Sequence, residues 1–321
     1  MSEMQLTEVA PRNRKLKTKS TKTKNPKLFI AVCTIPALLL TLVFMIIPTF
    51  RAFFMSFTDA TGMSDENKFI FLDNYKYMFQ DEMFLKALSN TFKLMLVVPV
   101  VTLAFGLVLA FLLTQTKLKE RGFYRTVFFF PSIISLTVVG IIWSFVFHPN
   151  MGILNNILSS IGLDQLTMTW LGDSRTALWC VAVTLIWQAV GYYMVMYIAA
   201  IDGISADVFE SATIDGAGYF RKLVSITIPL LKEIIGITFV LSLAGTINLS
   251  FIVVTIMTGG GPAGGTTVLL HYMYTQGFQN ANFGYAMAIA IFTLAFAFVL
   301  SFLSRLLTNR AEGCIVINRV L

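Results

Sequence analysis

Six long apolar segments most constrain what this chain can fold into. Each reaches the roughly 20 residues that a helix needs to cross a hydrocarbon core about 30 Å thick. The segments lie near residues 28–50, 94–113, 127–147, 177–200, 233–257 and 284–304. The pattern predicts an all-α, polytopic membrane protein with six transmembrane helices.

Composition supports the same fold class. Of the 321 residues, 56% are hydrophobic and 13% are charged, whereas a soluble domain carries roughly a quarter charged residues. Eight of the 24 Lys and Arg residues lie between Arg12 and Lys27, in a tail rich in Thr, Ser and Asn. Such a tail is typical of a disordered segment that contacts anionic membrane lipid, so we expect no nucleic-acid partner.

The cysteines and the N-terminus exclude two other classes. Cys33, Cys180 and Cys314 show no CxxC spacing, so neither a disulfide framework nor a metal site is indicated. The basic tail leads into an apolar run at 28–50 that is long enough to span a membrane, and no small-residue cleavage pattern follows it. This start is not typical of a cleaved signal peptide.

The distribution of positive charge predicts the orientation. If both termini are cytoplasmic, 18 of the Lys and Arg residues lie inside and 6 lie outside, as the positive-inside rule requires. We therefore expect a basic cytoplasmic tail at 1–27, a transmembrane domain at 28–307 and a cytoplasmic C-terminal tail at 308–321.

A polar island at residues 202–229 separates two of the apolar segments on the cytoplasmic side. Ser205 is expected to cap a short helix, and Asp207 and Glu210 place negative charge near its first turns, where the helix dipole favours it. Gly216 and Gly218 allow a bend, because glycine adopts positive φ without strain. A second short helix is expected from about Tyr219 to Pro229.

The polar island resembles the EAA loop of the permease subunits of binding-protein-dependent ABC importers. The residues that match the pattern are Glu210, Ala212, Asp215, Gly216, Ala217, Ile226 and Pro229. Ser211 and Ile228 depart from it by small changes. The alternative is an ordinary cytoplasmic loop with an amphipathic helix. The resemblance implies that a loop at 205–229 couples this chain to an ATPase, through Glu210, Ala212, Asp215, Gly216, Ala217, Gly218 and Pro229.

The same resemblance implies the rest of an assembly. Its fold is that of a type I ABC importer permease, in the subgroup that takes up maltose and multiple sugars. The implied partners are a second, related permease, two ATPase subunits and an extracellular solute-binding protein. ATP and Mg²⁺ are expected on the ATPase, so this chain is expected to be neither an enzyme nor a cofactor carrier. The implied location is the bacterial plasma membrane.

A glycine-rich loop at residues 258–267 lies on the predicted external side. A phosphate-binding Walker loop requires Lys before Ser or Thr, but aligning Gly260 and Gly265 with that pattern puts Thr266 at the Lys position. The loop resembles the Thr-Gly-Gly-Pro segment of the sugar-type permeases. That resemblance implies an external gate containing Gly260, Gly261 and Pro262; a plain turn-rich loop is the alternative.

Ionisable residues are missing from the interior of all six apolar segments. Proton relays, ion pathways and catalysts within a membrane usually need such groups, so the sequence argues against a proton-coupled transporter and a membrane enzyme. His148 and His271 lie near external ends of the segments. We expect both to be interfacial polar residues without a metal.

Uncharged polar residues form stripes on two segments, with Thr184, Gln188 and Tyr192 on the fourth and Ser242, Thr246 and Ser250 on the fifth. Hydroxyls, amides and aromatic faces suit a neutral, polyhydroxylated solute. The same residue types also mediate close packing between helices. The family resemblance favours a solute path containing Trp187, Gln188, Tyr192, Asn248 and Ser250.

The sequence thus predicts the pore-forming subunit of an ATP-driven importer for a sugar or oligosaccharide. One alternative is a permease for another small organic solute such as glycerol phosphate, although an anion would favour positive charge in the spans. An alternative of a different class is a channel or scaffold whose polar island docks a partner that is not an ATPase.

Overall fold

The structure is a computed structural model that describes residues 26–62, 67–116 and 118–317. It divides into two units, residues 1–50 and 51–321, and each is described by itself. Throughout the described residues the regular elements are helices, and the one β-bridge pairs Thr58 with Phe69. The predicted tail at 1–27 falls almost entirely outside the described residues. The all-α fold class is confirmed.

The first unit consists, where it is described, of a nearly continuous helix. It comprises α1 (Pro26–Thr41), the π-helical turn η1 (Leu42–Ile46) and the beginning of α2 (Ile47–Met55). Residues 29–55 together are long and apolar enough to cross a membrane. The span predicted near 28–50 is therefore helical.

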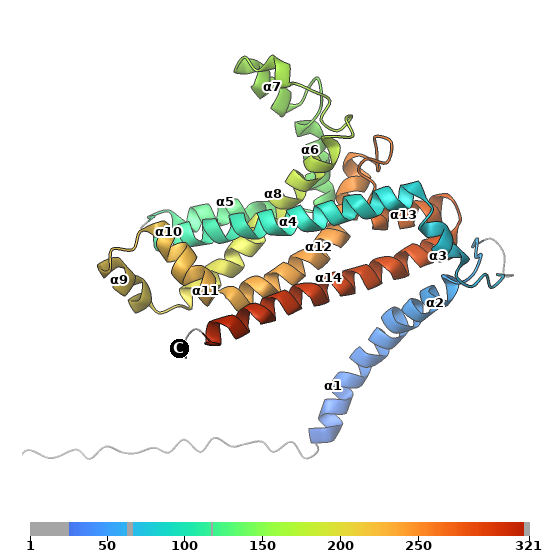
Figure 1. The fold of residues 1–321 in the computed structure, drawn as a ribbon, viewed down its shortest axis with the longest axis horizontal. Helices are drawn as coiled ribbons and strands as arrows, with labels where there is room; N and C mark the ends of the chain where they lie inside the picture. The colour runs from blue at the N-terminus through green and yellow to red at the C-terminus, as the bar shows by residue number, and fades with distance from the viewer. Residues whose placement is uncertain (1–25, 63–66, 117, 318–321) are drawn as a thin grey trace, which may run out of the picture. The chain divides into compact units, whose positions relative to one another are not determined.

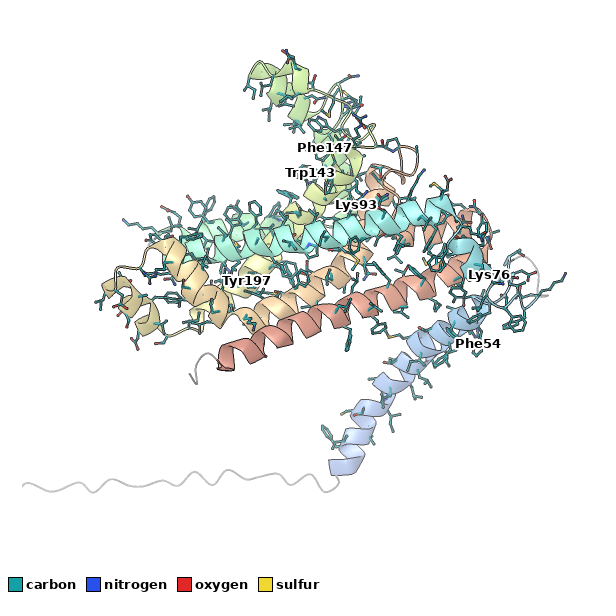
Figure 2. All side chains as sticks on the ribbon, viewed as in Figure 1. Phe54, Lys76, Lys93, Trp143, Phe147 and Tyr197 are labelled. Atoms are coloured by element: carbon teal, nitrogen blue, oxygen red, sulfur yellow. The ribbon has the colours of Figure 1, made fainter. Side chains whose placement is uncertain are left out.

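Four long helices form the body of the second unit: α4 (Glu82–Gln115), α8 (Ala177–Asp202), α12 (Lys232–Met257) and α14 (Phe283–Ile317) (Figure 1). Helix α12 lies against the other three. Tyr197 of α8 is buried between α8 and α12, and its hydroxyl lies 2.8 Å from Thr238 Oγ (Figure 2). Each helix contains a predicted span.

Helix α4 begins earlier than the apolar pattern indicated. The predicted span began near residue 94, whereas the helix starts at Glu82, where Asp81 Oδ1 accepts a hydrogen bond from Met83 N at 2.9 Å. A carboxylate at this N-cap position accepts a hydrogen bond from a backbone N–H, and its negative charge is stabilised by the positive end of the helix dipole. Lys93 is consequently an exposed residue within a continuous helix (Figure 2).

The segment predicted as a span near 127–147 is not one straight helix. Helices α5 (Arg121–Ile133) and α6 (Leu136–Val146) meet at 99°, and they make a sixth span only if the bent pair is counted as one. Two consecutive residues with extended backbone, Ile134 and Ser135, produce the turn. Pro131 weakens the last turn of α5 because it has no N–H to donate to the helix.

Helices α5 and α8 approach each other backbone to backbone. A Cβ atom placed on Gly191 of α8 would lie 1.9 Å from Phe128 O. One turn further along α5, Ser132 Oγ donates to Gln188 O at 2.7 Å and accepts from Tyr192 N at 3.1 Å. A hydroxyl that bonds both groups of a helix ladder holds the two helices in fixed register.

Short helices lie at the two ends of the long ones. Helices α9 (Ala206–Ile214), α10 (Tyr219–Lys222) and α11 (Ile228–Leu230) are at one end of the second unit. Helices α3 (Asp73–Met78) and α13 (Leu269–Tyr274) are at the opposite end, and α7 (Ile153–Ser160) lies beyond α6 (Figure 1). The polar island and the glycine-rich loop are therefore at opposite ends of the helices.

Candidate functional site

The polar island forms two short helices joined at a bend, as predicted. Helix α9 ends in a Schellman motif, in which Ala217 N donates to Ala212 O at 2.8 Å and Gly216 N donates to Thr213 O at 3.0 Å. Gly216 has φ of +76°, the left-handed conformation that glycine adopts without strain. Gly218 has φ of −70°, so its predicted contribution of positive φ was wrong.

The predicted cap of α9 is only partly realised. Ser205 occupies the N-cap position, but its side chain makes no cap hydrogen bond. Its hydroxyl instead lies 3.2 Å from Asp207 Oδ2 and donates to it. The carboxylate is a charged acceptor close in sequence, which makes this a strong hydrogen bond.

The second half of the polar island is one helical stretch. Helix α10, the π-helical turn η3 (Leu223–Thr227) and α11 follow one another, so the helix predicted to end near Pro229 reaches Leu230. Lys222 Nζ donates to Thr213 Oγ at 2.7 Å, which ties this stretch to α9. Phe209 and Ala212 of α9 are buried. We call residues 206–230 the knob. It is stabilised by the Schellman motif at its bend, by the Lys222–Thr213 hydrogen bond and by the burial of Phe209 and Ala212.

The outer surface of the knob carries large apolar side chains among its charged ones. Ile214 is 86% exposed and Phe220 is 79% exposed, with Glu210 exposed nearby in sequence. Exposed apolar side chains among charged ones are typical of a protein interaction site. Between the two helices lies a cavity of about 270 Å³ lined by Ala212, Asp215, Ala217, Arg221, Ser225 and Ile226. Pro229 is also exposed.

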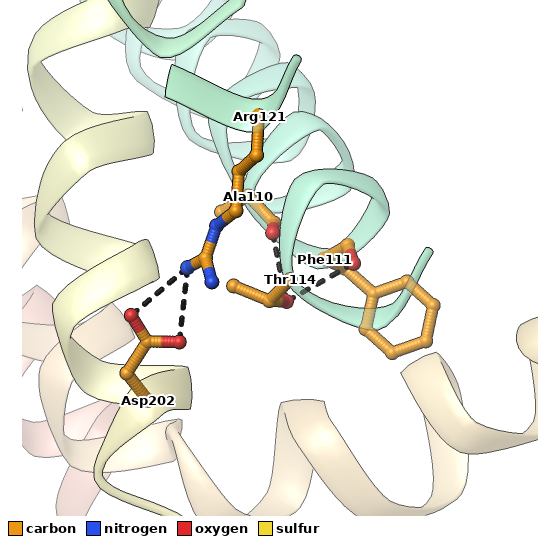
Figure 3. Close-up of polar contacts among 5 residues, drawn as sticks. All are labelled: Ala110, Phe111, Thr114, Arg121 and Asp202. Carbon is orange, nitrogen blue, oxygen red and sulfur yellow. Dashed lines mark hydrogen bonds and ion pairs between the residues drawn. The ribbon is translucent and has the colours of Figure 1, made fainter. Parts of the chain in front are cut away.

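An ion pair links the start of the polar island to α5. Arg121 Nη2 lies 3.0 and 2.9 Å from the two carboxylate oxygens of Asp202, the last residue of α8 (Figure 3). Thr114 closes the neighbouring end of α4 by donating to Ala110 O and Phe111 O (Figure 3). Both charged side chains are partly exposed, so the pair contributes only about 0–1 kcal/mol to stability. Its geometry nevertheless joins α5 to the residue that precedes the knob.

The residues predicted for a solute path fall into two groups. Trp187 is 39% exposed, Tyr192 is 49% exposed and Asn248 is exposed, whereas Gln188 is half-buried. Ser250 is 1% exposed, and its hydroxyl donates to Ile247 O at 3.0 Å within its own helix. The contribution of all five to a solute path remains a prediction.

The other hydroxyls of the two stripes face the interior of the bundle. Thr184, Ser242 and Thr246 are buried. Thr184 donates to Cys180 O at 2.9 Å, and Thr246 donates to Ser242 O at 2.8 Å. These bonds satisfy the hydroxyls of Thr184 and Thr246 inside their own helices. For these three residues the geometry favours helix packing over contact with a solute.

The glycine-rich loop is firmly attached to α4. Asn90 Nδ2 lies 3.3, 3.1 and 3.0 Å from the carbonyl oxygens of Gly264, Gly265 and Thr267. Thr91 Oγ accepts from Leu269 N at 2.9 Å. Neither residue was identified from the sequence, because an isolated Asn or Thr near the start of an apolar segment carries no distinctive pattern.

Replacing Asn90 with Ala is expected to loosen the loop. Removing the amide takes away the donor of Gly265 O and Thr267 O, whereas Gly264 O keeps its bond from Thr267 N. A buried acceptor left without a donor costs about 1–3 kcal/mol. The thermal midpoint of the detergent-solubilised protein should therefore fall. Asn248→Ala is the matched control, because among the described residues Asn248 Nδ2 bonds only to Ala244 O of its own helix. Equal midpoints for the two variants would contradict the anchoring role of Asn90.

His271 is not the interfacial residue that its position in the sequence suggested. Its side chain is buried on α13 beneath the glycine-rich loop, where a Cβ on Gly260 would lie 2.8 Å from the imidazole Cε1. Its Nδ1 has no hydrogen-bond partner among the described residues. Burial lowers the pKa of His271, because an apolar environment disfavours the charged form. The described residues contain no cluster of three metal-binding side chains.

Comparison with known proteins identifies the relatives of this chain. A family described as "Binding-protein-dependent transport system inner membrane component" matches residues 83–313. The chain is 37% identical over 298 residues to the diacetylchitobiose uptake system permease protein of Streptomyces coelicolor, covering 89% of this chain and 84% of that protein. It is 33% identical over 281 residues to the lactose transport system permease protein of Rhizobium radiobacter, covering 87% and 92%.

A solved structure shares the fold. It is described as a bacterial alginate ABC transporter in complex with an alginate pentasaccharide-bound periplasmic protein. One of its chains superposes with a TM-score of 0.78 at 25% sequence identity, covering 88% of this chain and 95% of that chain.

Proposed function

Because the chain belongs to the family of binding-protein-dependent transport system inner membrane components, we propose that it forms half of the pore of an ATP-driven importer for a sugar or oligosaccharide. The observation that carries the coupling role is the braced knob at 206–230, with its exposed apolar surface. ATP hydrolysis takes place on a separate ATPase, which binds ATP and Mg²⁺.

A neutral, hydroxyl-rich solute fits the chemistry of this chain. The diacetylchitobiose and lactose permeases to which it is similar are named for oligosaccharides. Tyr192 of α8 and Asn248 of α12, two exposed polar residues of the predicted solute path, are uncharged. Glycerol phosphate, the other substrate considered, would require compensation of its negative charge. A neutral sugar is therefore the better match.

The proposed partners are assigned to surfaces that are exposed in this chain. Helix α12 exposes a continuous stripe comprising Ile237, Leu241, Ala244, Asn248 and Thr255. A second, related permease placed against this stripe would complete a pore. Two ATPase subunits would bind on the side of the polar island, and an extracellular solute-binding protein on the side of the glycine-rich loop. Both termini are then cytoplasmic.

The knob acts as a lever in this proposal. Closure of the ATPase pair moves α9, and the Schellman motif and the Lys222–Thr213 bond carry that motion into α10 and α11 without bending. The Arg121–Asp202 pair carries it into α5. A rigid connection is required because a flexible loop would absorb the motion.

Charge reversal at Glu210 tests this function. Glu210→Lys is expected to reduce uptake to background, because it places a repelling charge on the surface that contacts the ATPase. Glu210 is exposed and forms no ion pair with any described residue, so the amount of protein in the membrane should not change. The measurement is uptake of labelled sugar by cells, with quantification of the permease in membranes.

The control is Asp164→Lys, which reverses an acid in the short 3-10 helix η2 (Asp164–Leu166), on the predicted external side. This variant should retain normal uptake. Retained uptake in Glu210→Lys would contradict the coupling role. Uptake by ATP-depleted vesicles would instead support the alternative of a channel.

A further inference from the structure

A cavity of about 440 Å³ lies against the glycine-rich loop at the end of the helices opposite the polar island. This volume is in the range of small-molecule sites, about 300–1,000 Å³. Side chains from four helical elements contribute to its wall: Met83 from α4, Thr255 from α12, His271 and Tyr272 from α13, and Thr275 and Gln279 from the π-helical turn η4 (Thr275–Gln279). The glycine-rich loop forms the remaining side through Gly259–Gly261, Gly264 and Thr267.

His271 gives the cavity an unsatisfied polar group. The residue is 8% exposed, and within the described chain its Nδ1 has no hydrogen-bond partner. A neutral imidazole carries one donor and one acceptor, and a buried polar group without a partner is costly. The buried Nδ1 has no surface that a ligand atom could reach, so the other ring nitrogen, Nε2, is the one left for a ligand hydroxyl.

Two further side chains in the wall also offer free hydrogen-bonding capacity. Gln279 is exposed, and its amide bonds to none of the described residues. Thr255 is exposed and donates to Phe251 O at 2.6 Å, which leaves the lone pairs of its hydroxyl available. Amide, hydroxyl and imidazole groups together match the alternating donors and acceptors of a sugar ring.

Aromatic residues neighbour two of the wall residues in the chain, since Tyr274 precedes Thr275 and Phe278 precedes Gln279. The rings of Phe251 and Tyr274 are 5.6 Å apart, and Tyr274 stacks on Phe278 at 5.1 Å. Tyr274 is 37% exposed and Phe278 is 66% exposed. Exposed aromatic faces beside a few convergent polar groups are typical of a site for small molecules.

The wall is uncharged and continuous with the exposed stripe of α12. None of the described lining residues carries a carboxylate, an ammonium or a guanidinium group. Asn248, Phe251 and Thr255 follow one another at helical spacing along α12. The cavity therefore lies at the end of the same face on which Asn248 is exposed.

We propose that this cavity is a carbohydrate-binding subsite at the external mouth of the pore. The hydroxyls of one sugar unit bond to His271, Gln279 and Thr255, and the ring packs on Tyr274. The proposal rests on the sugar class proposed above and adds a place where the sugar binds on the permease itself.

The test measures sugar binding to the permease complex purified with its ATPase and without the binding protein. Lactose and diacetylchitobiose are the probes, and their dissociation constants are measured by ligand-observed NMR. His271→Phe keeps an aromatic ring and removes both nitrogens, while Gln279→Ala removes an exposed amide that supports no fold contact. Each is expected to weaken binding by about 3- to 10-fold, the value of one neutral hydrogen bond.

Asn280→Ala is the control, because Asn280 is exposed next to Gln279 but does not line the cavity. Its affinity should equal that of the unmodified complex. Unchanged affinity in Gln279→Ala and His271→Phe would overturn the subsite, as would failure of the unmodified complex to bind either sugar. Hydrolysis stimulated by the sugar-loaded binding protein, measured on the same preparation, reports the importer function separately.

Discussion

Replacing Gly216 with proline is expected to abolish sugar uptake while leaving the protein in the membrane. Proline holds φ near −65°, whereas Gly216 has φ of +76°. Proline also removes the hydrogen bond from Gly216 N to Thr213 O. The bend between α9 and α10 would therefore change direction and move the exposed face of α9 out of the position proposed to contact the ATPase. Uptake of labelled sugar and the permease content of membranes are the two measurements.

Gly218→Ala is the control for Gly216→Pro. It tests whether the effect comes from the positive φ of Gly216 or from the loss of any glycine in this loop. Gly218 has φ of −70°, and a Cβ there would meet no atom within 4 Å. Alanine fits this position and leaves the bend at Gly216 unchanged, so uptake should stay near normal even though the family resemblance included Gly218 among the coupling residues. If both variants transported equally, the bend at Gly216 would have no part in coupling.

The largest effect on stability is expected for Gly191→Ala. The new Cβ would lie 1.9 Å from Phe128 O, and the atom that it meets belongs to the backbone of α5. Helices α5 and α8 would have to separate, which would also break the two hydrogen bonds of Ser132. We expect a loss of about 3 kcal/mol, the upper part of the usual range for overpacking. Thermal unfolding in detergent measures it.

The same substitution at Gly245 provides the comparison. Gly245 lies within α12, and a Cβ there would meet nothing within 4 Å. Alanine is a better helix former than glycine by about 1 kcal/mol, so Gly245→Ala should be neutral or slightly stabilising. A similar fall in both variants would mean that the α5–α8 contact does not limit stability.

The long apolar segments were sufficient to predict the membrane-spanning helices but not where these helices end or bend. Long apolar segments identify a span because the membrane allows few alternatives. The start of α4 at Glu82 depends instead on the cap at Asp81, which lies outside the apolar run. The 99° bend between α5 and α6 lies at Ile134 and Ser135, beside Ser132, whose hydroxyl bonds to α8. Contacts between segments that are distant in the chain produce no local pattern in the sequence from which they could be predicted.

In the candidate sites, too, features set by local sequence could be predicted and features set by tertiary contacts could not. The bend at Gly216 was predictable because glycine carries its backbone preference within the residue itself. The hydrogen bonds of Asn90 to the glycine-rich loop join residues more than 170 positions apart, so no local sequence pattern predicts them. Burial of His271 likewise depends on a loop that folds over it. The uncharged stripes were ambiguous, and burial shows that Thr184 and Thr246 pack inside the bundle.

Co-purification from mild detergent tests the central claim, which is that the knob at 206–230 docks an ATPase. We expect the unmodified chain to purify with a second permease and an ATPase whose hydrolysis is stimulated by the sugar-loaded binding protein. Ile214→Asp should lose the ATPase yet keep its thermal midpoint, because Ile214 is 86% exposed. A well-folded chain that purifies without any ATPase, or an Ile214→Asp variant that retains a fully active one, would contradict the account.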